Sequence, residues 1–135
     1  MKTKEYQAET ERSARETAIL LEEVRIRLEN GDILSLLEQR GVLHSVQLLI
    51  ESAIGKAKRK LKSSKQTIPV SGYDTFEVLA QNKVISDRDL ISWKKAIGLR
   101  NAIVHEYQNI NWADVELVIK ENRIHFVIDF LKEAF

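Results

Sequence analysis

The sequence has no cysteine and few chain-breaking residues, with one proline and five glycines among 135 residues. Without cysteine there is no disulfide, no thiol nucleophile and no cysteine-ligated zinc. A β-sandwich or barrel needs many tight turns, which usually contain proline or glycine, and this sequence has few of either. Both scarcities favour an all-α protein without covalent cross-links.

Neither net charge nor long apolar runs point to a partner. Lys and Arg total 21 against 20 Asp and Glu, for a net charge of +1, so contact with RNA would need a local basic patch. No apolar run approaches the roughly 20 residues that span a bilayer. The first residues, MKTKEYQAETER, are too polar for a secretory signal. We expect a cytoplasmic protein without membrane contact, folded as a single domain over residues 1–135.

Apolar residues recur at spacings of three and four, which predicts an antiparallel bundle of four long helices plus one short helix. The first helix is expected over about residues 6–29. Asp32 is the expected N-cap of the second helix, whose apolar face would begin with Ile33, Leu36 and Leu37. This second helix is the longest, and its wide apolar face predicts contact with more than one neighbour.

The second half of the chain is expected to hold a loop, a short helix and two longer helices. The loop covers residues 63–72, and the short helix about 75–81. Ser86 and Asp87 cap a fourth helix, in which Val104 is among the residues expected to face the core. After a loop at residues 109–111, one last helix is expected to continue to the terminus.

A basic cluster lies at the far end of the second helix and contains Lys56, Arg59 and Lys60. Such cations commonly lie in solvent and complement the negative end of the helix dipole. They also suit a phosphate-contacting patch, because local positive charge strengthens binding to nucleic acid. We therefore take Lys56, Arg59 and Lys60 as candidate RNA-contacting residues.

The segment GLRNAIVHEYQNI, residues 98–110, gathers polar groups that suit phosphoryl chemistry. An imidazole such as that of His105 can both accept and donate a proton within one reaction cycle. The Arg100 guanidinium can stabilise charge on a pentacoordinate phosphorus, and Asn101 can add a hydrogen bond. Together these residues suffice for RNA cleavage without a metal ion or other cofactor.

The spacing of Arg100 and His105 does not by itself make a site. Five residues correspond to about 140° around a helix, so the two side chains share a cleft only if the arginine reaches across, the helix ends near His105, or two copies meet across a two-fold axis. The ordinary alternatives are a helix-end histidine, an arginine paired with Glu106 or another carboxylate, and an edge aromatic at Tyr107. Glu51 either lies on the solvent-exposed surface of the second helix or lines the cleft that Arg100 and His105 would share.

The segment RNAIVHEY, residues 100–107, resembles the R-N-x-x-x-H-x-Y motif of the HEPN superfamily, in its HepT-like toxin branch. The preceding stretch TFEVLAQNKVIS and the following NINWADVELVI are similar to the same family. The resemblance covers the helical layout of nearly the whole chain, and the eight-residue motif is specific for the family. The N-terminal helix and the lysine-rich segment are not diagnostic.

The resemblance implies a metal-independent ribonuclease toxin acting on tRNA or mRNA, with tRNA the expected substrate. It implies a homodimer with its active groove between two motif helices, and an MntA-like minimal nucleotidyltransferase as antitoxin partner. Arg100 and His105 would be catalytic and Asn101 supporting. Tyr107 would be the modification site, to which the antitoxin transfers AMP from ATP to silence the toxin.

Two other classes of function remain open from the sequence. A catalytically inactive HEPN module would dock on or regulate a nucleotidyltransferase, and it would form a tight complex without cutting RNA. A structural helical adaptor would have an unrelated partner, and Arg100 and His105 would then be independently replaceable.

Overall fold

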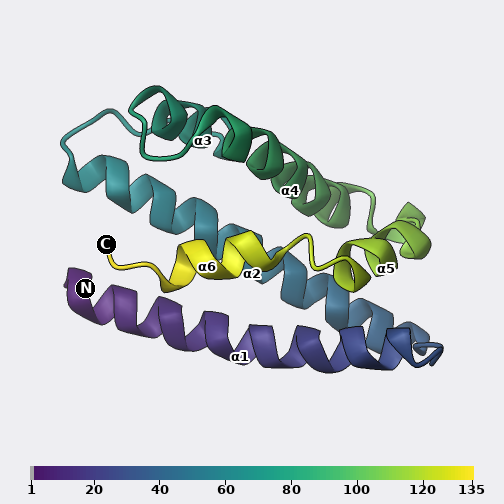
Figure 1. Ribbon diagram of the computed structural model, residues 1–135. Coiled ribbons are helices and arrows are strands. Elements are labelled where there is room, and N and C mark those ends of the chain that lie inside the picture. Colours follow the sequence, from purple (N-terminus) through teal and green to yellow (C-terminus); the bar gives the residue numbers. More distant parts are fainter. Residues whose placement is uncertain (1) are drawn as a thin grey trace.

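The computed structural model describes residues 2–135 and contains helices and turns but no strand in that range, which confirms the all-α prediction (Figure 1). The helices follow in the order α1 (Thr3–Glu29), α2 (Leu36–Ser63), α3 (Gly72–Gln81), α4 (Asp87–His105), the 3-10 helix η1 (Tyr107–Asn109), α5 (Trp112–Lys120) and α6 (His125–Lys132). None of the helices in residues 2–135 is long and apolar enough to cross a membrane.

Helix α2 runs through the middle of the bundle, between α1 on one side and α3 and α4 on the other (Figure 1). It packs against α1, α3, α4 and α6, which explains its wide apolar face. Its positions Val46, Ile50, Ala53 and Ala57 are fully buried. Helix α4 runs antiparallel to α2 (Figure 1), so the end of α4 lies beside the first half of α2.

An aromatic cluster joins α3, α4 and α6 in the core. The rings of Phe76 and Trp93 are stacked, with centroids 4.1 Å apart, and Phe126 and Phe130 lie edge-on to Trp93. Such pairs add to the stabilisation from burial alone. The cluster therefore fixes α4 against α3 and α6 and holds the helix that carries the motif.

The start of α2 differs from the prediction. Gly31 has φ +84°, and the backbone N–H of Asp32 donates to the carbonyl of Arg27 at 3.0 Å, so Asp32 belongs to the end of α1. Ser35 caps α2 instead, in a reciprocal capping box with Glu38. The expectation that Ile33, Leu36 and Leu37 are buried is wrong, because they lie before or in the first turn and are exposed.

The predicted last helix is divided into two. Asn122 takes the left-handed conformation, with φ 54°, and ends α5 as asparagine does at many helix termini. The N–H of Arg123 donates to the carbonyl of Val118 at 3.0 Å. The chain then turns at the buried Ile124 and restarts as α6, so that α5 and α6 both pack against α1.

Lys56 is buried, so the prediction that it contacts RNA is wrong. Its ammonium donates to the carbonyl oxygens of Phe130 at 2.7 Å and Glu133 at 2.6 Å. These carbonyls belong to the end of α6 and have no partner within the helix. Lys56 therefore fastens the C-terminal helix to α2.

The other two basic candidates lie near the ends of the chain. The Arg59 guanidinium lies over the ring of Tyr6, 4.1 Å from its centroid. The Lys60 ammonium lies 5.4 Å from the centroid of Phe135. Both side chains are half-buried, and their contact with RNA stays a prediction.

We expect the stability of the protein to rise with pH between about 8 and 10.5. Burial, assisted by the charge of Lys60, lowers the pKa of Lys56 to about 8, below its ordinary value of 10.5. Within this window the unfolded chain holds a proton that the folded chain has lost, so raising the pH favours folding, by at most about 1.4 kcal/mol per pH unit. The neutral amine still has two N–H groups for the two short hydrogen bonds.

Urea unfolding at several pH values checks this expectation, with Lys56→Met as the control. The variant should show a flatter stability profile above pH 8. Parallel profiles for the two proteins would contradict the assignment to Lys56.

Candidate functional site

The sequence motif begins in the last two turns of α4 and ends just beyond this helix, at Tyr107. Ser86 caps the start of this helix by accepting from the N–H of Asp89, and the helix ends at His105. His105 is exposed at that end. The prediction that Val104 faces the core is wrong: it is 39% exposed, because Ile103 takes the inward position of this turn.

Arg100 is held by a carboxylate from α2. Its Nε and Nη2 donate to one oxygen of Glu51, Oε2, at 2.9 and 2.7 Å, and its Nη1 donates to Oδ1 of Asn101 at 3.1 Å. The side chains of Arg100 and Glu51 are 28% and 31% exposed. The ion pair therefore forms with Glu51 rather than Glu106, and it fixes the direction of the guanidinium.

Arg100, Asn101 and Glu51 line one pocket between α2, α3 and α4, with a volume of about 470 Å³. Lys58 and Tyr73, which the sequence analysis did not single out, line it too. His105 and Tyr107 do not. No hydrogen bond joins Arg100 to His105 within residues 2–135. One copy of the chain thus gathers the arginine, the asparagine and the carboxylate, and leaves the histidine outside.

His105 shares one face of α4 with three residues that precede it. Ile91, Gly98, Ala102 and His105 are spaced by seven, four and three residues, which places them on one face of the helix. Ile91 is 58% exposed. Gly98 is covered from within the chain, because a Cβ at this position would lie 3.3 Å from the Tyr73 hydroxyl.

Tyr107 begins the 3-10 helix that follows α4 and is 43% exposed. The Arg40 guanidinium, from α2, lies over its ring at 5.4 Å from the centroid. Arg40 was not singled out from the sequence, because the two residues are far apart in the chain and only the register of α2 against α4 brings them together.

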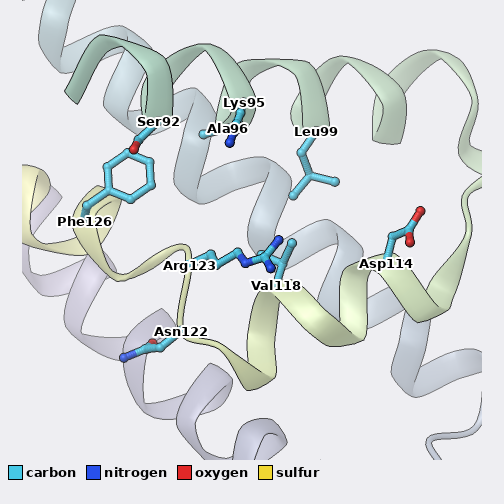
Figure 2. Close-up of a pocket in the computed structure, with 9 residues that line it drawn as sticks. All are labelled: Ser92, Lys95, Ala96, Leu99, Asp114, Val118, Asn122, Arg123 and Phe126. Carbon is cyan, nitrogen blue, oxygen red and sulfur yellow. The ribbon is translucent and has the colours of Figure 1, made fainter. Parts of the chain in front are cut away.

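A second pocket of about 450 Å³ lies between α4 and the α5–α6 segment (Figure 2). In Figure 2, Lys95, Ala96 and Leu99 reach it from α4, and Val118 faces them from α5. None of the predicted site residues lines it. The candidate site therefore stays at the junction of α2 with the end of α4.

The helical bundle and the polar motif at the end of α4 agree with the resemblance to the HEPN superfamily that the sequence shows. The chain belongs to the ribonuclease HepT-like family, whose model matches residues 14–134. The resemblance stated from the sequence is thereby confirmed, and with it the ribonuclease class of enzyme.

Relatives of known name agree with this family. The chain is 34% identical over 96 residues to the mRNA nuclease HepT of Shewanella oneidensis, covering 70% of this chain and 72% of the relative. Among solved structures, it is 27% identical to a tri-AMPylated Shewanella oneidensis HEPN toxin in complex with an MNT antitoxin, with a TM-score of 0.75 over 94% of this chain and 96% of the other.

A further structure, of a toxin–antitoxin with AMP-PNP, is 24% identical, with a TM-score of 0.78 over 94% of this chain and 98% of the other. At that identity the similarity shows a shared fold.

Proposed function

We propose that this protein is a metal-independent endoribonuclease toxin acting on tRNA or mRNA, silenced by AMP transfer to Tyr107 from a nucleotidyltransferase antitoxin. The observation that carries the proposal is the fixed position of Arg100, held by Glu51 and Asn101 on the same helix end that exposes His105 and Tyr107. A guanidinium oriented in advance toward a half-open pocket suits a developing phosphorane charge.

In the proposed reaction, His105 accepts the proton of a ribose 2′-OH, whose oxygen attacks the adjacent phosphorus. The bond from phosphorus to the 5′-oxygen then breaks, and that oxygen takes up a proton. Arg100 stabilises the additional negative charge of the pentacoordinate species, and Asn101 keeps the guanidinium in position. The products are a 2′,3′-cyclic phosphate and a 5′-hydroxyl.

We propose that two copies complete the active groove. In a single chain His105 does not line the Arg100 pocket, and five residues separate it from Arg100, which is about 140° around a helix. Two copies of α4 that face each other across a two-fold axis would gather two arginines and two histidines around one groove.

The proposed silencing follows from the position of Tyr107, two residues beyond His105. Its exposed ring is accessible to a modifying enzyme. An attached AMP adds bulk and negative charge where an RNA phosphate must dock. The tri-AMPylated state of the Shewanella toxin that was solved with its MNT antitoxin supports this proposal.

Purified protein is expected to cleave RNA in the presence of EDTA and to leave 2′,3′-cyclic phosphate ends. Both properties follow from a mechanism in which His105 and Arg100 do the chemistry without a metal ion. Denaturing gel electrophoresis and mass spectrometry of the fragments give the measurement, with tRNA and mRNA as separate substrates. Tight binding of a nucleotidyltransferase without any cleavage would instead favour the inactive docking module.

A further inference from the structure

Arg40 lies beside Tyr107 without an acidic partner. It is an exposed residue of α2, and its guanidinium carbon is 5.4 Å from the centroid of the Tyr107 ring. By contrast, Arg27 and Arg100 pair with Glu38 and Glu51. Within residues 2–135, no ion pair engages the guanidinium of Arg40, so its donors remain available.

Other titratable groups also lie close to Tyr107, beginning with His105 two residues before it. His44 is also exposed on α2, one helical turn beyond Arg40. Glu106, the C-cap of α4, is the adjacent acidic residue in the chain. Arg40 is therefore the permanent positive charge that the fold places against the tyrosine ring. A negative group attached to the phenolic oxygen would be introduced next to this cation.

We infer that Arg40 forms a binding site for the phosphodiester of AMP attached to Tyr107. The inference rests on the proposed function, which makes Tyr107 the acceptor. In the transfer, the phenolic oxygen attacks the α-phosphorus of ATP, the bond to the bridging oxygen breaks, pyrophosphate leaves and the phenolic proton passes to solvent. The diester keeps one negative charge, and its two non-bridging oxygens match the two-pronged donor geometry of a guanidinium.

A contact between Arg40 and the phosphodiester would hold the attached AMP in one orientation. Arg40 precedes Glu51 by eleven residues on α2, which is about 16 Å along the helix. An adenylyl group tied to Arg40 is held along α2, on the side of the helix pair that carries Arg100 and Glu51, instead of moving freely in solvent. Silencing then depends on where the nucleotide is held as well as on its charge.

The site is tested by installing phosphotyrosine at position 107 during translation and titrating its phosphate by phosphorus NMR. This probe requires no antitoxin. Beside Arg40 the phosphate should bind its second proton about threefold more weakly than in the Arg40→Ala protein, because a nearby cation favours the dianion. Arg40→Lys should recover part of the effect. Arg88→Ala is the matched control, since Arg88 is exposed on the first turn of α4 and has no ion pair within residues 2–135.

Equal proton affinities in the parent protein and Arg40→Ala would overturn the inference. If Arg40→Ala leaves the phosphate titration unchanged but raises the KM for RNA, Arg40 contacts the substrate instead. The proposed function fails separately: if the phosphate senses Arg40 but the cognate antitoxin and ATP leave Tyr107 unmodified, the anion site stands and the silencing route does not.

Discussion

Replacing His105 with alanine is expected to slow RNA cleavage by at least about 100-fold, the usual size of a lost general acid–base group. The folded structure should persist, because the side chain is exposed and lies at the end of α4. Single-turnover cleavage of labelled RNA measures the rate, and thermal unfolding of the same preparations shows whether the fold is intact.

Two other histidines provide matched controls. His44 and His125 are both exposed, and neither belongs to the motif. His44→Ala and His125→Ala should cleave RNA at close to the wild-type rate. If His105→Ala cuts as fast as these controls, the proposed mechanism is wrong.

The Tyr107→Phe protein is expected to remain an active ribonuclease that its antitoxin no longer silences by AMP transfer. The change removes only the phenolic oxygen, so the ring and its contact with Arg40 persist while the acceptor of AMP is lost. Mass spectrometry of the wild-type protein after incubation with antitoxin and ATP should show additions of about 329 Da, the mass of one AMP group. The variant should show none at this position.

Growth of cells that co-express toxin and antitoxin gives the functional measurement. Cells with Tyr107→Phe should stop growing, while cells with the wild-type toxin should grow. Tyr6→Phe is the control, since Tyr6 lies on α1, outside the motif and outside the Arg100 pocket. A Tyr107→Phe toxin that its antitoxin still silences would show that the antitoxin acts by docking and not by modification.

The sequence predicted the helices well where apolar periodicity was strong. The expected first helix is present, with Ala14, Leu21 and Leu28 of α1 buried on one face, and Ser86 caps α4 as expected. The break between α5 and α6 was missed because it depends on one asparagine, Asn122, in a left-handed conformation. Apolar residues continue on both sides of that break, so the pattern gives no sign of it.

Long-range polar contacts were not predictable in the same way. Lys56 was grouped with solvated lysines, because its burial depends on where the end of α6 lies. The pairing of Arg100 with Glu51 likewise depends on the register between α2 and α4. The sequence alone leaves Glu51 as either a surface residue of α2 or a residue that lines the groove. The motif itself was identified through its family resemblance, since spacing alone left ordinary alternatives open.

Helix α2 carries both Glu51 and Arg40, the partners of Arg100 and of Tyr107. Because α2 is one uninterrupted helix from Leu36 to Ser63, these two partners cannot slide independently along α4. A shift of α2 by one turn would move both contacts by about 5.4 Å in the same direction. Under the proposed roles, RNA cleavage and silencing both depend on the position of α2 relative to α4. A change that loosens the α2–α4 packing therefore alters both together.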